Sequence, residues 1–229
     1  MGCAKNTICY SDNGAGLSDR IAVFNAMLRW SIALGAAFQP DIPCRLLAPS
    51  HNNNVSVPCT LPWSHYLLFP AGHTTQFCPC SLNVTSFYKV QRYISVPSEG
   101  QLITLSPTVD KAANMLLKEI QSPSEFDLLH IRRSDAIDAC NTSLPRMLAS
   151  LKTRKFQTSF VIFSTDEKSA DYTLAIVEAL RARNLNVVFI EPLLSQLYPF
   201  DNYFSYAILI KLGRLASHVH EWRRHFSCP

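Results

Sequence analysis

Along the second half of the chain, short apolar runs alternate with segments whose apolar residues recur about every 3.6 positions. The runs predict strands, and the segments between them predict amphipathic helices. The predicted order is helix 108–121, a strand beginning at Phe126, helix 144–155, strand 159–164, helix 168–184, strand 186–191 and a last helix from Asp201 to about Trp222. Strands that alternate with helices in this way favour a parallel sheet with helices on both faces. The pattern therefore predicts an α/β protein.

The N-terminal part also begins with the pattern of a strand followed by a helix. A β-prone run at 6–10 leads into a glycine-bearing loop at 11–20, and helical apolar spacing follows from Ile21 to Ala37. Residues 42–100 are rich in proline and cysteine, so long regular elements cannot form there and short strands and loops are expected. We predict an N-terminal half at 1–107, with this irregular region inside it, and a C-terminal half at 108–229.

Composition narrows the class of protein. Of 229 residues, 48% are hydrophobic and 17% charged, which is enough to build a sizeable core. The net charge of +4 is mild and the basic residues form no long runs, so nucleic acid is not an expected partner, whereas an anionic small ligand is. The most apolar stretch, 21–38, contains Arg29, so we interpret it as a helix of a globular domain and expect no transmembrane segment.

Eight cysteines are more than a cytosolic enzyme of this size usually carries, and disulfides explain them. The pairing stays open at this stage. A metal is not expected, because the Cys78–Pro79–Cys80 triplet lacks a partner cluster at zinc spacing. Glycosylation triplets at Asn54, Asn83 and Asn141 favour a secretory lumen. Since the sequence begins without a visible signal peptide, a cytoplasmic location is the alternative.

Charged residues gather where two of the predicted strands end. The first strand of the C-terminal half closes with His130, Arg132, Arg133 and Asp135, and the next one closes with the pair Asp166–Glu167. Ligands of open α/β sheets bind at the carboxyl ends of strands. A guanidinium fork binds phosphate in a bidentate manner and keeps its charge. These ends predict a site for a phosphate-bearing ligand, with a surface ion pair as the alternative.

The first loop carries Gly14 and Gly16 ahead of a predicted helix, an arrangement that lets backbone approach an anion. Asp19 stands where the dinucleotide fingerprint requires its third glycine, which argues against a Rossmann-type enzyme using a dinucleotide cofactor. A tight turn needed only for packing is the other interpretation of these glycines.

Three motifs in this order resemble the fucosyltransferase superfamily that includes protein O-fucosyltransferases, α1,6-fucosyltransferases and the nodulation fucosyltransferase. They are the loop at 14–20, the segment His130–Asp135, which fits the family's HxRRxD element, and the end of the following strand at 163–167. The resemblance covers about residues 1–40 and 125–205. It implies a GT-B-like fold of two facing Rossmann-like halves with parallel sheets, and transfer of fucose from GDP-fucose with inversion and without a metal or other cofactor.

The resemblance also implies roles for individual residues. Arg132 matches the arginine that contacts the donor pyrophosphate and helps GDP depart, and Asp19 is the carboxylate of the first loop that offers a base for the acceptor hydroxyl. The remaining matches shape the nucleotide-sugar site: Gly14, Gly16, Arg20, His130, Arg133, Asp135, Asp166, Glu167 and Asp201. The implied partners are a nucleotide-sugar donor and a glycan or protein acceptor.

Two departures from the family pattern are visible. Ser134 replaces a frequent glycine. Relatives follow the late helix with a strand and a Ser/Thr-rich phosphate loop, whereas here the sequence after Leu215 shows no such loop, so a compact or truncated C-terminal half is expected. This motivates an alternative function, a non-catalytic nucleotide- or glycan-binding relative of the same fold.

Overall fold

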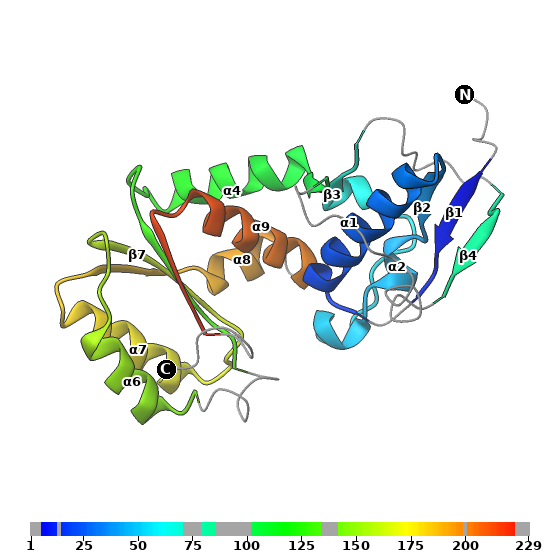
Figure 1. Ribbon diagram of the computed structural model, residues 1–229. Coiled ribbons are helices and arrows are strands. Elements are labelled where there is room, and N and C mark those ends of the chain that lie inside the picture. The colour runs from blue at the N-terminus through cyan, green and yellow to red at the C-terminus, as the bar shows by residue number, and fades with distance from the viewer. Residues whose placement is uncertain are drawn as a thin grey trace. The chain divides into compact units, whose positions relative to one another are not determined.

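The computed structural model describes residues 6–12, 15–70, 79–85, 102–133, 142–198 and 201–222 (Figure 1). These residues divide into two compact units, which are described separately. The first unit takes the described residues of Met1–Lys111 together with Tyr198–Ile208, and the second takes those of Ala112–Leu197 and Leu209–Pro229. Two helices, α4 (Pro107–Glu119) and α9 (Asn202–Leu215), contribute residues to both units.

The second unit is built on a four-stranded parallel sheet of order β8-β7-β6-β9. Its strands are β6 (Asp127–Ile131), β7 (Phe160–Thr165), β8 (Asn186–Phe189) and β9 (His218–Trp222). Its helices α6 (Leu144–Thr153), α7 (Ala170–Arg181) and α8 (Glu191–Leu197) lie between strands along the chain. The predicted α/β class with a parallel sheet is confirmed.

Side chains of β6 and β7 point alternately to the two faces of this sheet. Leu129 and Ile131 of β6 face α6 and α7, and they belong to a core cluster with Met147, Leu151, Val161, Phe163, Tyr172, Ile176, Val177, Leu180 and Val187. Figure 1 shows α6 and α7 together on one face of the sheet. On the other face, Gly213 of α9 comes close to Leu128 and Val219. The sheet is therefore covered on both sides, as its nearly continuous apolar strands require.

The predicted last helix, from Asp201 to Trp222, is wrong in its final part. The helix ends at Leu215, and His218–Trp222 forms the edge strand β9, parallel to β6. The backbone N–H of Ser217 donates to the carbonyl of Phe126 at 2.8 Å and begins this pairing. Within β9, His220 is buried, whereas His218 and Val219 are exposed. A strand therefore follows the late helix within the described residues.

The first unit contains a three-stranded parallel sheet of order β2-β1-β4, with β1 (Thr7–Tyr10) in the middle. Its neighbours are β2 (Ala37–Pro40) and β4 (Leu82–Val84), and helix α1 (Leu17–Ala33) connects β1 to β2. The described parts of region 42–100 contain short elements: α2 (Pro43–Leu46), two 3-10 helices (Pro49–Asn52 and Trp63–His65) and β3 (Leu67–Leu68). Strand β3 pairs antiparallel with β5 (Thr104–Leu105), which lies just after this region.

The expected helix 21–37 is shifted in the structure. Helix α1 starts at Leu17 and ends at Ala33, and Gly35 then adopts φ +60°, a conformation that glycine accepts without steric cost. This turn lets Ala37–Pro40 pair with β1, because Ala37 N–H donates to the carbonyl of Asn6 at 2.9 Å. Phe24 of α1 then packs edge-on against Tyr10 and Trp63, at ring-centroid distances of 6.0 Å and 4.8 Å.

Two disulfides cross-link segments of the first unit, with sequence separations of 71 and 15. Cys9 of β1 is bonded to Cys80, just ahead of β4, and Cys44 of α2 is bonded to Cys59. These pairs account for all four cysteines within the described ranges, so the disulfide explanation holds for each of them. None of the helices described here is long and apolar enough to cross a bilayer.

Candidate functional site

The carboxyl ends of β6 and β7 lie side by side, because the two strands are parallel and Ile131 pairs in register with Thr165. The residues that follow these strands are Arg132 and Arg133 on one side and Asp166 and Glu167 on the other. The structure thus brings together two arginines and two carboxylates that are more than 30 residues apart in the sequence. They form the candidate site of the second unit.

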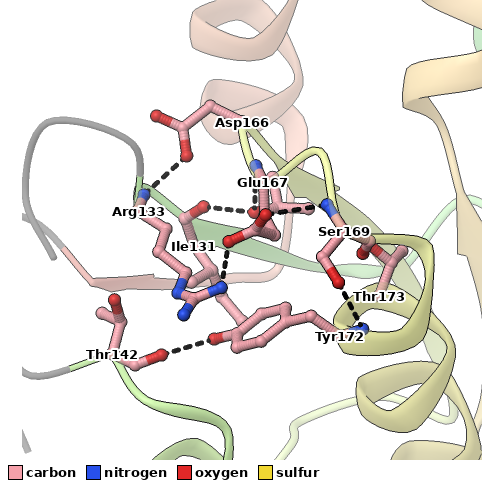
Figure 2. Close-up of polar contacts among 9 residues, drawn as sticks. Ile131, Arg133, Thr142, Asp166, Glu167, Ser169, Tyr172 and Thr173 are labelled. Carbon is pink, nitrogen blue, oxygen red and sulfur yellow. Dashed lines mark hydrogen bonds and ion pairs between the residues drawn. The ribbon is translucent and has the colours of Figure 1, made fainter.

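Arg133 is held by contacts within this cluster, as Figure 2 shows. Its backbone N–H donates to Oδ1 of Asp166 at 2.5 Å, and its guanidinium forms an ion pair with the Glu167 carboxylate. The guanidinium also lies over the ring of Tyr172, 4.3 Å from its centroid. The Arg133 and Glu167 side chains are only 19% and 16% exposed, so solvent screens this pair weakly.

Tyr172 was not anticipated from the sequence as part of the site, because its place in the apolar stripe of α7 indicates a core residue. Its ring does pack in the core, while its hydroxyl donates to the carbonyl of Thr142 at 2.9 Å. Burial raises the pKa of Tyr172 to about 12, and the charge of Arg133 partly opposes that shift. The residue therefore stays neutral and serves Arg133 as an aromatic surface.

The loop after β7 is fixed by its own hydrogen bonds, several of which are visible in Figure 2. The Thr165 hydroxyl donates to the carbonyl of Ile131 at 2.7 Å and accepts the Glu167 N–H at 3.1 Å. Oε1 of Glu167 accepts the N–H of Ser169 at 2.7 Å, and Ser169 caps α7 through the N–H of Tyr172 at 3.3 Å. Both carboxylates thus stand on a rigid turn between β7 and α7.

His130 lies on the other face of the sheet, opposite Ser164 in register. Its Nδ1 is 3.1 Å from the Ser164 hydroxyl oxygen, and that hydroxyl lies 2.5 Å from Oε1 of Glu191 at the start of α8. Burial raises the pKa of Glu191 to about 8, although hydrogen bonds from Ser164 and the N–H of Thr165 oppose the shift. Ser164 and Glu191 were not singled out from the sequence, since Glu191 directly follows an apolar run and gives no motif.

Arg132 is half-buried and immediately follows β6. If the alternation of the strand continues for one residue, Arg132 points to the side of His130, whereas Arg133 points to the side of Ile131 and α7. The contact of Arg133 with Tyr172 agrees with this alternation.

In the first unit, the loop before α1 brings Gly16, Asp19 and His51 together. Gly16 is the N-cap of α1 and Asp19 lies exposed in its first turn. A Cβ placed on Gly16 would lie 3.9 Å from Nδ1 of His51 and 4.0 Å from Oδ2 of Asp19. These are ordinary van der Waals distances, so the space around Gly16 would also admit a small side chain.

Arg20 has a different environment from that expected of a ligand-contacting arginine. It is 2% exposed, its Nε donates to the carbonyl of Leu46 at 3.0 Å and its guanidinium donates to the Tyr10 hydroxyl at 2.7 Å. Arg20 thus joins α1 to β1 and α2 beneath the loop.

Asp201 begins α9 in the first unit. Its Oδ1 accepts the N–H of Phe204 at 3.1 Å, which caps the helix, and its Oδ2 accepts the Tyr66 hydroxyl at 2.9 Å. Nε2 of His65 lies 3.4 Å from the same Oδ2, and the His65 ring stacks on Phe204. Burial, and then the Asp201 charge, raise the pKa of Tyr66 well above its usual value.

Two of the predicted site residues, Gly14 and Asp135, lie outside the described residues. Within the described ranges, no group of three or more His, Cys, Asp or Glu side chains is arranged to hold a metal ion.

Comparison with known proteins finds likeness only at the level of structure. No protein-family model and no curated protein sequence matches this chain. A crystal structure of NodZ α1,6-fucosyltransferase soaked with GDP-fucose is similar with a TM-score of 0.52 and 12% identity, covering 97% of this chain and 90% of that chain. A structure of POFUT1 in complex with GDP is similar with a TM-score of 0.53 and 13% identity, covering 96% of this chain and 92% of that chain.

A third structure, POFUT1 in complex with GDP-fucose, has a TM-score of 0.51 and 12% identity over 96% of this chain and 91% of its own. At these identities the likeness establishes the fold. The parallel sheets of this chain belong to a fold of the GT-B type, which it shares with these fucosyltransferase structures.

Proposed function

We propose that this protein transfers fucose from GDP-fucose to a hydroxyl group of a glycan or protein acceptor, with inversion at the sugar and without a metal ion. The observation that carries the proposal is the cluster at the carboxyl ends of β6 and β7, where Arg132 and Arg133 stand beside Asp166 and Glu167. It occurs in a fold shared with fucosyltransferases that were crystallised with GDP or GDP-fucose.

The chemistry required for this transfer suits Arg132. Cleavage of the sugar–phosphate bond builds negative charge on the departing diphosphate, and a preorganised guanidinium stabilises that charge in place of a metal. Arg133 is engaged with Glu167 and Tyr172, so we assign it to shaping the site rather than to the leaving group. Asp166 is exposed beside it, and its carboxylate can accept N–H donors of a nucleotide base.

Inversion requires a base for the attacking hydroxyl. We assign this role to Asp19, which lies exposed in the first turn of α1. Gly14, His130 and Asp135 complete the proposed set. The buried contacts of Arg20 and the capping contacts of Asp201 support these two residues as parts that hold the loop and α9 in place.

The disulfides support an oxidising compartment as the place of this reaction. Cys9–Cys80 and Cys44–Cys59 persist only in an oxidising compartment, which favours the secretory lumen over the cytoplasm. Acceptors in that compartment include glycans and protein hydroxyls.

A nucleotide screen tests the proposal first. Calorimetry with GDP, UDP, GDP-fucose and GDP-mannose is expected to show binding of the guanine nucleotides and tighter binding of GDP-fucose than of GDP-mannose. GDP release from GDP-fucose is then followed with and without candidate acceptors. Absence of GDP binding to the folded protein rejects the proposal. GDP binding without any turnover identifies a non-catalytic relative instead.

Mutation of the proposed catalytic arginine sharpens this test. Arg132→Ala is expected to lower turnover by about 10²- to 10³-fold, the usual loss when one preorganised charge-stabilising group is removed. The melting temperature is expected to change little. Arg45→Ala is the matched control, because Arg45 is 69% exposed and lies in α2, far from this cluster in sequence and in the other unit. A collapse of the fold in Arg132→Ala would make Arg132 a structural residue.

A further inference from the structure

The sequence carries three Asn-x-Ser/Thr triplets, the acceptor sequence for N-linked glycans, and the proposed sugar transfer uses none of them. Asn141 lies outside the described residues, whereas the triplets that begin at Asn54 and Asn83 are both described. Both belong to the first unit, which also holds the two described disulfides. Because those disulfides favour the secretory lumen, where N-linked glycans are attached, each triplet is a candidate modification site.

Asn54 lies at the end of a tight turn on the surface of the first unit. The 3-10 helix Pro49–Asn52 precedes it, and Asn53 and Asn54 then adopt φ values of 51° and 60°. This is the left-handed conformation, which asparagine accepts more readily than most residues. The Asn54 backbone N–H donates to the carbonyl of Pro49 at 2.9 Å and closes the turn. Residues 53–56 are all exposed, so the complete triplet faces solvent.

The neighbouring Asn52 anchors this turn from beneath. It is 2% exposed, its Oδ1 accepts the N–H of Asn202 at 2.7 Å, and its Nδ2 donates to the carbonyl of Val55 at 3.2 Å. Val57, which follows the triplet, is buried as well. The exposed residues are thus held between two buried ones. None of these contacts involves the Asn54 side chain, so a glycan on its amide would break none of them.

The triplet at Asn83 has a different environment, although Asn83 is exposed too. Asn83 is the middle residue of β4 and pairs in register with Cys9 of β1. Its Oδ1 accepts the Ser11 hydroxyl at 3.1 Å, and the Ser11 N–H donates to the carbonyl of Val84 at 3.0 Å. A glycosylating enzyme must bind the whole triplet, so β4 would first have to separate from β1 by local opening. Asn54 needs no such opening in the folded protein.

We propose that Asn54 carries an N-linked glycan and is the preferred acceptor of the two described triplets. In the transfer, a bond forms between Nδ2 of Asn54 and C1 of the first sugar, and the bond from C1 to a diphosphate oxygen of a lipid-linked donor breaks. The lipid diphosphate leaves with the electron pair, and the amide loses one proton. Ser56 supplies the hydroxyl that the acceptor sequence requires. The proposal rests on the turn and the disulfides and is independent of the proposed fucose transfer.

Site mapping on the full-length chain tests the proposal. The protein is directed into the secretory pathway of cultured animal cells, and peptide-N-glycosidase in ¹⁸O-labelled water then converts each glycosylated asparagine to a labelled aspartate. Mass spectrometry of the peptides is expected to show label at Asn54 in most molecules and a smaller labelled fraction at Asn83. Absence of label at Asn54 in the folded, secreted protein would overturn the proposal. A labelled fraction at Asn83 that equals or exceeds the fraction at Asn54 would overturn the preference.

Variants of the triplets confirm the assignment without changing either asparagine. Ser56→Ala removes the required hydroxyl and leaves Asn54 in its left-handed conformation, so it is expected to lose the label at Asn54 and the gel mobility shift of one glycan. Ser56→Thr is expected to retain both, and Thr85→Ala is the matched control at the other triplet, with the label at Asn54 unchanged. Equal gel mobility of Ser56→Ala and wild type would contradict the assignment. The wild-type site map decides the proposal even where a variant is secreted poorly.

Discussion

Arg132 and Arg133 are neighbours in sequence, yet the structure gives them different surroundings. Arg133 has an ion pair with Glu167, a backbone bond to Asp166 and an aromatic surface in Tyr172, and its Nε is buried without a hydrogen-bond partner among the described residues. A guanidinium held in this way is preorganised, which reduces the entropy lost when it takes part in binding. Arg132, which follows β6 directly, is half-buried beside it.

At the residue scale, the raised pKa of Glu191 predicts how the stability of the protein changes with pH. Its pKa is raised from 4.5 to about 8 in the folded protein, so the folded state holds one more proton than the unfolded state between these two values. The stabilisation from this proton is fully present below pH 4.5 and is lost as pH rises through about 8. Within that window the free energy of unfolding is expected to fall by about 1.4 kcal/mol per pH unit from this group.

Glu191→Gln removes the titrating group while preserving the acceptor, so its unfolding free energy is expected to depend less steeply on pH over this range. Chemical denaturation of both proteins at several pH values between 5 and 8 measures the difference. Glu178→Gln, in the middle of α7, supplies the control for loss of one carboxylate. Parallel pH profiles for wild type and Glu191→Gln would show that Glu191 is charged in the folded protein.

At the scale of elements, β9 is secured to the sheet by a buried polar pair. Nε2 of His220 lies 3.0 Å from Oδ2 of Asp127 at the start of β6, and both side chains are essentially inaccessible, at 1% and 0% exposure. Burial lowers the pKa of His220 despite the adjacent carboxylate, so at neutral pH it donates as a neutral imidazole. The same Asp127 oxygen accepts the N–H of Gln157 at 2.7 Å. Asp127 thus joins β6 to β9 and to the segment before β7.

His220→Ala is therefore expected to be destabilising, by about 1.5–3 kcal/mol, because a buried carboxylate loses its imidazole donor. His218→Ala is the matched control on the same strand, since His218 is exposed and its loss is expected to change stability by about 0.5 kcal/mol or less. Urea denaturation followed by circular dichroism measures both. Equal, small effects would show that the Asp127–His220 pair does not hold β9.

The same strand shows where prediction from sequence reached its limit. Alternating periods of two and 3.6 identified β6, β7 and β8 and the helices between them, because each carries enough apolar residues to show its period. Segment 216–222 directly follows α9 and has few apolar residues, so its pattern predicts a continuation of the helix. Its strand conformation comes from pairing with β6 and from the Asp127–His220 contact, which no local pattern encodes.

Some residues of the candidate site could likewise be predicted from the sequence, and others could not. Charges at strand ends are visible in sequence, and parallel pairing explains why Arg133 meets Asp166 and Glu167. The supporting residues are not visible, since Tyr172 and Ser164 sit at positions that suit an apolar core equally well. Arg20 differs from these residues, because it stands in a predicted ligand-binding motif. In the structure its guanidinium is buried and bonded to Leu46 and Tyr10.

At the scale of the whole molecule, the two units rely on different means of stabilisation. The second unit contains the continuous core between its sheet and helices α6 and α7. The first unit has shorter strands and a proline-rich irregular region, and both described disulfides lie within it. The first unit buries apolar side chains such as Phe24, Phe38 and Tyr66 as well, and its disulfides add covalent support by lowering the conformational entropy of the unfolded chain. We therefore expect the stability of the two units to respond unequally to loss of a disulfide.

The double variant Cys44→Ser/Cys59→Ser tests this expectation while leaving Cys9–Cys80 in place. Its closed loop has a sequence separation of 15, for which the chain-entropy model gives a loss of about 3 kcal/mol. Hydrogen exchange resolved by segment is expected to accelerate in β1, β2 and α1, with protection of β6 and β7 unchanged, because local opening reports each unit's own stability. Equal acceleration in both sheets would mean that the units unfold together, so that a disulfide in one stabilises the candidate site in the other.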